Sequence, residues 1–117
     1  MLVGVPKEIK NHEYRVGMTP GSVRELVRHG HAVIVQKGAG SAIGLSDEQY
    51  AAAGAELADS AEEVFARAQL IVKVKEPQPE ECRRLRPDQT LFTYLHLAPD
   101  PRQTDLLLAS GVTAIAY

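Results

Sequence analysis

Three basic side chains, far apart in the sequence, are the residues best suited to bind and transform a small acid. Arg15 carries a planar guanidinium that can bind a carboxylate through two parallel hydrogen bonds and keeps its charge at any working pH. Lys75 supplies a point charge, and His96 supplies an imidazole that can accept and return a proton near neutral pH. This set suits a small carboxylate ligand, provided that the fold brings the three side chains together.

Each of these residues also has an ordinary structural interpretation. Arg15 could form a surface salt bridge, since arginine is common in surface loops. A histidine in an apolar run such as the one around His96 is more often a hydrogen-bonded core residue than a catalytic one. Lys73 lies two residues before Lys75 on the same face of the expected strand, so we expect one of the two to be only a snorkelling side chain. Lys75 is favoured for the site because it is nearer the strand end.

Composition excludes several classes of function. The 13 Lys and Arg residues against 15 Asp and Glu residues give a formal charge of -2, and no basic run indicates a nucleic-acid or anionic-membrane surface. Cys82 is the only cysteine, so neither an internal disulfide nor a cysteine metal cluster is expected, and the chain suits a reducing cytoplasm. We find no leader pattern and no apolar run near the ~18 residues that a membrane helix needs.

Hydrophobic periodicity and capping signals predict alternating strands and helices in one domain of 117 residues. Polar N-cap residues, prolines in the first turn and glycines after the last turn mark the helix boundaries. The predicted strands cover residues 2–5, 31–36, 70–75, 90–95 and 112–116, and the predicted helices cover residues 20–29, 46–54, 60–68, 80–85 and 101–109.

This alternation, with strands that are nearly all apolar, predicts an α/β fold: an open parallel sheet with helices on both faces, of the flavodoxin-like or Rossmann-like three-layer kind. The carboxyl ends of parallel strands gather at one edge, where such sheets bind ligands. Arg15, Lys75 and His96 all follow strands, so we expect them at the same rim. Tyr117 ends the sequence directly after a strand that nothing covers, and we expect the sheet to be incomplete without further chain.

A glycine-rich segment, residues 38–44, follows a predicted strand and resembles a dinucleotide-binding fingerprint. Its third glycine is one residue late, and no long helix opens at once. We interpret it as a turn that enters the helix beginning near Ser46. If a nucleotide cofactor is used, its binding domain is expected outside these residues.

Four motifs, in this order, resemble the N-terminal region of the alanine dehydrogenase family. The resemblance extends from the first residues to Tyr117, and the shared order makes it far more specific than any single motif. It implies that residues 1–117 are the N-terminal part of a substrate domain and that a dinucleotide-binding Rossmann domain lies in chain not present here. The motifs are Gly4-Val5-Pro6-Lys7-Glu8, Tyr14-Arg15-Val16-Gly17-Met18-Thr19-Pro20, Val74-Lys75-Glu76-Pro77 and Tyr94-Leu95-His96-Leu97-Ala98.

The resemblance also implies an activity: reversible NAD-dependent oxidative deamination of L-alanine to pyruvate and ammonia, by a homo-oligomer that is commonly a hexamer. It implies that Arg15 and Lys75 bind the carboxylate and carbonyl side of the substrate and that His96 is the acid-base residue. Tyr94 could line the pocket or pack in the core. On this basis the 117-residue chain alone is expected to be inactive, since the cofactor domain is missing.

Other functions remain open. The nucleotide-handling subunit of proton-translocating transhydrogenase shares the opening motifs but needs no acid-base histidine, so the Leu-His-Leu-Ala run around His96 favours the dehydrogenase. Saccharopine dehydrogenases are a more distant resemblance. A non-catalytic module that binds a small carboxylate is also possible, because a fold alone never fixes activity.

Overall fold

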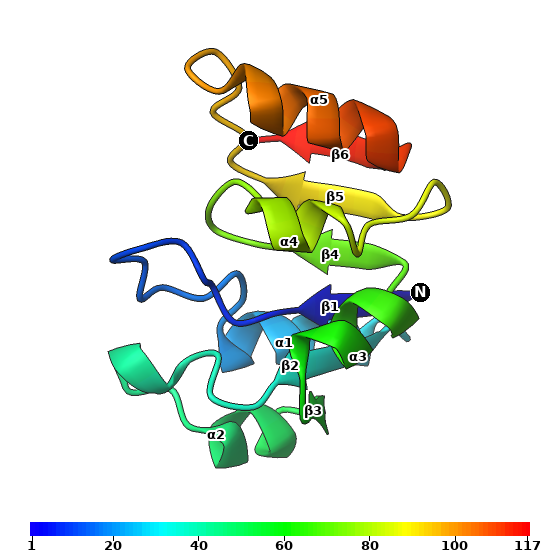
Figure 1. Ribbon diagram of the computed structural model, residues 1–117. Helices are drawn as coiled ribbons and strands as arrows, with labels where there is room; N and C mark the ends of the chain where they lie inside the picture. Colours follow the sequence, from blue (N-terminus) through cyan, green and yellow to red (C-terminus); the bar gives the residue numbers. More distant parts are fainter.

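Strands and helices alternate along residues 1–117, all of which the computed structural model describes (Figure 1). The strands are β1 (Leu2–Val5), β2 (Ala32–Gln36), β3 (Glu56–Ala58), β4 (Leu70–Val72), β5 (Thr90–Thr93) and β6 (Thr113–Ala116). The helices are α1 (Pro20–Arg28), α2 (Asp47–Ala52), α3 (Ala61–Arg67), α4 (Pro79–Cys82) and α5 (Pro101–Ser110), with a short 3₁₀ turn, η1 (Ser41–Ile43).

The helix boundaries follow the capping signals in the sequence. The side chain of Thr19 accepts a hydrogen bond from the backbone N–H of Ser22 and begins α1. Ser46 and Gln49 form a reciprocal capping box at the start of α2. Helix α5 ends at Gly111, whose φ of 71° lies in the left-handed region that glycine adopts without strain. The predicted helices are therefore confirmed, with ends shifted by a few residues.

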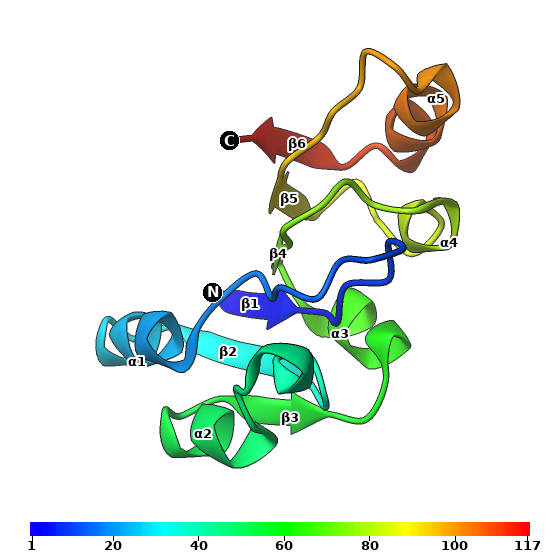
Figure 2. The same ribbon diagram turned by 90° about the vertical axis from the view of Figure 1, so that its left-hand side faces the viewer.

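The six strands form one sheet in the order β3-β2-β1-β4-β5-β6, and every pair is parallel. The first three strands extend the sheet in one direction and the last three in the other, so the direction reverses between β1 and β4. Because crossover connections have one hand, the helices of the two halves belong on opposite faces. Figure 2 shows this arrangement, with α1 and α2 on one side and α3, α4 and α5 on the other. The predicted α/β parallel sheet is confirmed.

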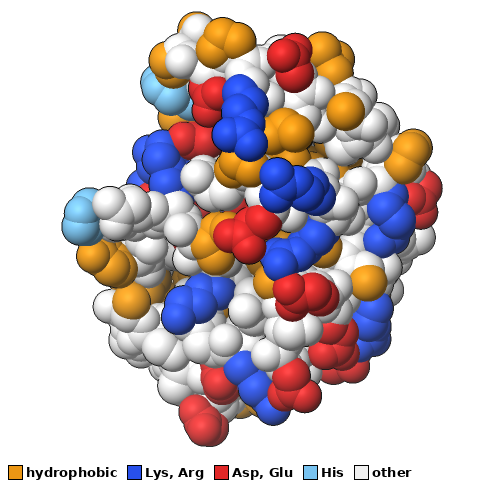
Figure 3. Space-filling model, in the orientation of Figure 1, with side chains coloured by type: hydrophobic (Ala, Val, Ile, Leu, Met, Phe, Trp, Pro, Cys, Tyr) orange, Lys and Arg blue, Asp and Glu red, His pale blue; other side chains and the backbone are white.

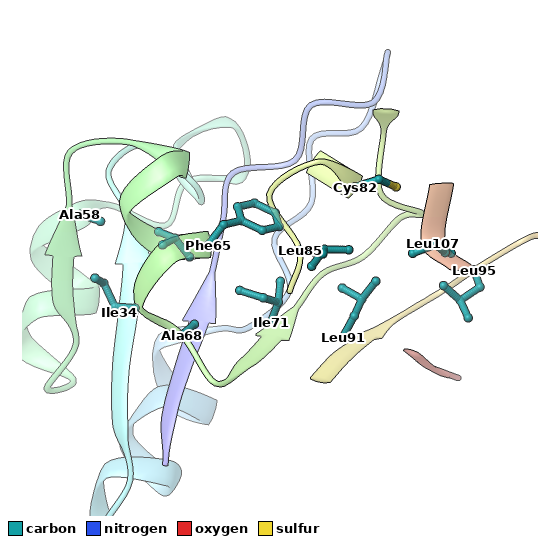
Figure 4. Close-up of a cluster of buried hydrophobic side chains, with 11 residues drawn as sticks. Ile34, Ala58, Phe65, Ala68, Ile71, Cys82, Leu85, Leu91, Leu95 and Leu107 are labelled. Carbon is teal, nitrogen blue, oxygen red and sulfur yellow. The ribbon is translucent and has the colours of Figure 1, made fainter. Parts of the chain in front are cut away.

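Two separate cores lie on the two faces of the sheet. On one face, Val3, Val33 and Val35 of the sheet pack with Val23 of α1 and Tyr50 of α2. On the other face the core runs from β2 to α5, and Figure 4 shows its side chains between the strands and the covering helices. Its members are Ile34, Ala58, Val64, Phe65, Ala68, Ile71, Cys82, Leu85, Leu91, Leu95 and Leu107.

Helices cover both faces only over the β3-β2-β1 half of the sheet. On the α1 side, β5 and β6 are uncovered: Phe92 is in register with Ile115, and these residues are 36% and 49% exposed. The ring of Phe92 contacts Tyr117, with centroids 4.9 Å apart. The three-layer expectation therefore holds for half of the sheet.

Two predicted strands end earlier than expected, and one strand was missed. Strand β4 ends at Val72 rather than Lys75, because the N–H groups of Val74 and Lys75 bond to a side chain instead of a neighbouring strand. Strand β5 stops at Thr93 rather than Leu95, at the residue where its pairing with β6 also ends. Strand β3 is an edge strand of three residues with Leu57 as its only large apolar residue, too weak a pattern to read from the sequence.

The surface carries both signs of charge. On the face with α3 and α4 in front, Lys and Arg side chains alternate with Asp and Glu side chains, and no patch of one sign stands out (Figure 3). Several of them form exposed ion pairs, such as Arg67 with Glu56 and Glu63. None of the helices is both long and apolar enough to span a membrane.

Candidate active site

The candidate site lies at the carboxyl edge of the sheet, where the strand order reverses between β1 and β4. Open α/β sheets bind ligands at such reversal points. Figure 2 views the sheet from this edge and shows the long loop after β1 running beside the segment after β4. Gly17 makes this approach possible, since a Cβ there would lie 2.6 Å from the carbonyl oxygen of Val72. The loop that carries Arg15 is thereby packed against the end of β4.

Arg15 is paired with a carboxylate of its own loop. Its Nε lies 2.9 Å from Oε2 of Glu13 and its Nη2 lies 2.7 Å from Oε1, a bidentate pair. The Arg15 side chain is 63% exposed, whereas that of Glu13 is 6% exposed. The hydrogen bonds from Arg15, with a smaller contribution from the positive charge of Lys75, lower the pKa of Glu13 to about 2. Glu13 is therefore ionised at working pH, and a substrate carboxylate would compete with it for Arg15.

Lys75 follows β4 and lies at the centre of the edge. Its ammonium nitrogen is 5.3 Å from the centroid of the Tyr94 ring, within range of a cation–π contact. Its positive charge also acts on Glu13, as the lowered pKa of that carboxyl shows. Lys75 thus connects the loop after β1 with the segment after β5.

Tyr94 and His96 form a pair on the segment after β5. The Tyr94 hydroxyl lies 2.8 Å from Nδ1 of His96, and the two rings stack with centroids 5.3 Å apart. Both side chains are exposed, so neither is the core residue that the structural interpretation requires. His96 has a φ of 48°, a left-handed conformation that non-glycine residues seldom adopt and that concentrates at functional sites.

The structure links the predicted residues in a row without enclosing them in one cavity. The row runs from Arg15 and Glu13 through Lys75 to Tyr94 and His96. Arg15 lines a hollow of about 440 Å³ formed by the loop after β1, whereas His96 lines a hollow of about 340 Å³ beside α5. Lys10 lines both hollows.

Lys73 does not snorkel, and that expectation is wrong. Its side chain is 1% exposed and lies 3.0 Å from Glu8 and 3.2 Å from Glu81, a buried triad of charges. Burial raises the pKa of Glu81, and the charge of Lys73 opposes that rise. The strand alternation that predicted a shared face with Lys75 fails because β4 has already ended at Val72.

Sequence reasoning missed the two carboxylates that organise these cations. Glu13 is two residues from Arg15, a spacing that could have suggested the pair. Glu8 closes the first motif but had no assigned role, and its partner Lys73 is 65 residues away in sequence. Only the topology brings those two residues together.

The glycine-rich segment after β2 does not fit a dinucleotide phosphate. The backbone N–H of Gly38 donates to Oδ1 of Asp47 at 2.8 Å, so a carboxylate already takes the place of a phosphate oxygen. The segment continues into η1 and then α2, a helix of six residues. The turn interpretation of residues 38–44 is consistent with this geometry.

The structure forms neither a metal site nor a reactive cysteine. No group of three or more His, Cys, Asp or Glu side chains is arranged to hold a metal ion. Cys82 is buried, and desolvation raises the pKa of its thiol to about 11, so it is protonated at neutral pH and a poor nucleophile.

Comparison with known proteins identifies close relatives. The family model described as alanine dehydrogenase/PNT, N-terminal domain, matches residues 4–117. The alanine dehydrogenases of Mycolicibacterium smegmatis and Bacillus subtilis are 57% and 50% identical over 117 residues. These matches cover 100% of this chain but 32% and 31% of the relatives, so the chain spans about a third of their length.

Solved structures give the same result. An L-alanine dehydrogenase superposes with a TM-score of 0.96 at 50% identity, covering 100% of this chain and 32% of that one. A transhydrogenase from Sinorhizobium meliloti superposes with a TM-score of 0.92 at 27% identity, covering 99% of this chain and 34% of that one.

Proposed function

We propose, from the premise that this chain belongs to the alanine dehydrogenase/PNT N-terminal domain family, that it is part of the substrate domain of an NAD-dependent alanine dehydrogenase. The observation that carries the proposal is the 50–57% identity with alanine dehydrogenases of two organisms over the whole chain. The proposed reaction is the reversible oxidative deamination of L-alanine to pyruvate and ammonia. We place the complete protein in the cytoplasm as a homo-oligomer, in keeping with the family resemblance.

NAD would accept the hydride in this reaction, but residues 1–117 do not fit the cofactor. The one glycine-rich turn that could approach a pyrophosphate is occupied by Asp47. We therefore assign NAD binding to a dinucleotide-binding domain in further chain, in line with relatives about three times as long. The roles below concern only the residues of this chain.

Arg15 is proposed to bind the substrate carboxylate. Its fork already holds the Glu13 carboxylate in a bidentate pair, and this supports the proposal because a substrate carboxylate has the same two oxygens to offer. Binding requires the substrate to displace Glu13 or to share Arg15 with it. The guanidinium is exposed, so a ligand can reach it.

Lys75 and His96 are proposed to act on the reacting carbon. The ammonium of Lys75 would stabilise negative charge on the carbonyl oxygen of pyruvate and on the oxygen that water adds to the imine. His96 would take a proton from that water and return it in the reverse direction. Tyr94 contacts both residues, with its hydroxyl on Nδ1 of His96 and its ring beneath Lys75, so it would line the pocket and orient the imidazole.

The test is alanine oxidation by the complete chain encoded by the gene, followed as NADH formation. Replacing His96 by Ala should lower kcat by about 10²- to 10⁴-fold, the usual contribution of a general acid-base residue. Replacing His31 by Ala serves as a control, because His31 lies at the opposite end of the sheet, directly before β2. A kcat close to the wild-type value in His96→Ala would exclude the acid-base role.

Transhydrogenase is the second candidate, supported by the close superposition on the Sinorhizobium meliloti protein. Its lower identity, 27% against 50%, makes it the weaker one. Hydride transfer between two nicotinamide nucleotides, without alanine oxidation, would favour it. Pyruvate binding without any turnover would instead favour a non-catalytic carboxylate-binding module.

A further inference from the structure

The three residues after β4 are held by an unusual set of hydrogen bonds. Their six backbone polar groups are all bonded, and only the N–H of Lys73 uses a backbone partner, the carbonyl of Phe92. The Tyr117 hydroxyl lies 2.8 Å from the carbonyl oxygen of Lys73 and 3.1 Å from that of Val74. The other three groups are bonded to Glu8 and Thr93.

Lys75 is fixed from both sides of its backbone. Oε1 of Glu8 accepts from the N–H of Lys75 at 3.0 Å, and Oε2 accepts from the N–H of Val74 at 3.1 Å. On the other side, the Thr93 hydroxyl donates to the carbonyl of Lys75 at 2.9 Å. These bonds determine where the Lys75 side chain starts and in which direction it leaves the sheet edge.

Using a buried carboxylate, Glu8, to hold two N–H groups is unfavourable in free energy. Its side chain is 1% exposed, and removing a carboxylate from water costs several kcal/mol per ion even when it is paired. Lys73 offsets this cost at 3.0 Å and also contacts Glu81. A strand that simply continued would satisfy the same N–H groups with backbone carbonyls and no buried charge. The triad is therefore better explained by the geometry it imposes than by stability alone.

We propose that Glu8 is a positioning residue for Lys75: its buried carboxylate, neutralised by Lys73, sets the backbone from which the Lys75 ammonium reaches the substrate. Thr93 assists from β5 by holding the carbonyl of the same residue. This inference rests on the proposed function, because the position of Lys75 matters for binding only if Lys75 contacts the substrate. Glu8 itself touches no substrate and acts only through Lys75.

The test measures pyruvate binding to the complete chain in the presence of NAD⁺, a combination that cannot turn over. Glu8→Gln keeps the shape of the side chain but loses the charge, and its amide hydrogens face one of the two N–H donors. We expect the Kd for pyruvate to rise at least tenfold while the Kd for NAD⁺ stays within twofold. Glu62→Gln is the matched control, since Glu62 is an exposed carboxylate whose ion-pair partner is Arg84.

A milder pair of variants covers the case in which Glu8→Gln does not fold. Thr93→Val removes only the hydroxyl that donates to Lys75, and Thr93→Ser restores it. We expect Thr93→Val to weaken pyruvate binding about threefold to tenfold, and Thr93→Ser to bind within twofold of the wild type. If Thr93→Val and a folded Glu8→Gln both bind pyruvate as the wild type does, the positioning role is wrong.

A double-mutant cycle with Lys75→Met separates positioning from a general structural effect. If Thr93 and Glu8 act through Lys75, their replacement should change pyruvate binding less than twofold once Lys75 is Met. An equal loss in both backgrounds would overturn the proposal. A wild-type chain that oxidises alanine while the variants bind pyruvate normally would contradict only this inference. A wild-type chain that neither binds pyruvate nor oxidises alanine would overturn the proposed function as well.

Discussion

The Lys75 side and the His96 side of the same sheet edge are held in different ways. Around Lys75, buried charges and side-chain hydrogen bonds fix the backbone of three consecutive residues. His96 lies on an exposed segment, in a strained conformation, with Tyr94 as its hydrogen-bond partner. The backbone that carries Lys75 is therefore anchored to buried groups, whereas His96, the proposed acid-base residue, lies at the surface and is open to water.

The largest expected effect is on the buried side. Lys73→Met would leave Glu8 and Glu81 as buried carboxylates without a counter-ion, which should lower the free energy of unfolding by about 3–5 kcal/mol. Urea unfolding of the complete chain, followed by circular dichroism, measures this change. The same substitution at the exposed Lys37, which pairs with Asp59, should leave the unfolding midpoint nearly unchanged. Equal effects of the two substitutions would remove the contrast between the buried and the exposed side.

Arg15→Lys tests, through activity, a third and exposed residue of the same sheet edge. A single ammonium cannot reproduce the bidentate fork, so kcat/KM for alanine should fall by about 10- to 100-fold, as expected for the loss of a charged hydrogen bond. Because Arg15 is exposed, the unfolding midpoint should not change. Steady-state kinetics and thermal unfolding of the same preparation check both statements. Unchanged kinetics would mean that Arg15 does not bind the substrate and only forms a surface ion pair with Glu13.

The smallest effect on stability is expected at His96. His96→Gly should raise the free energy of unfolding by about 0.5–1 kcal/mol, since glycine adopts a φ of 48° without strain although it costs some chain entropy. Activity should be lost in the same variant. Ala98→Gly is the control, because Ala98 is also exposed on this segment but is not among the positive-φ residues, so it should lose stability. If His96→Gly is less stable than the wild type, the strain at His96 does not matter.

Much of the framework could be predicted because it depends on local patterns. Caps at Thr19, Ser46 and Ser60 mark the helices, and apolar runs mark the longer strands, so the parallel sheet follows. The arrival of Lys75 and His96 at one edge follows from parallel strand direction alone. The family resemblance could be recognised because it rested on whole motifs rather than single residues, and the match to the family model confirmed it.

The contacts that hold the site could not be predicted from those patterns. The triad of Lys73 joins residues from the loop after β1, the end of β4 and α4, and no local signal pairs them. The end of β4 at Val72 depends on Glu8, so the apolar run 70–75 was predicted as one strand throughout. A surface salt bridge of Arg15 was one of two open alternatives, and its partner Glu13 was identified only from the loop geometry.

The reversal of strand order between β1 and β4 has a consequence for the order of events during synthesis. The Glu8–Lys73 contact joins residues 65 positions apart, and Lys75 is set by that contact. Closing so long a loop costs conformational entropy, and the contacts formed when β1 pairs with β4 offset that cost. A nascent chain that has released only its first three strands therefore lacks Lys75 and the contacts that hold it. The Glu8 contacts form when β4 docks beside β1, and the candidate site is complete only after β5 and the segment that follows it have added Thr93, Tyr94 and His96.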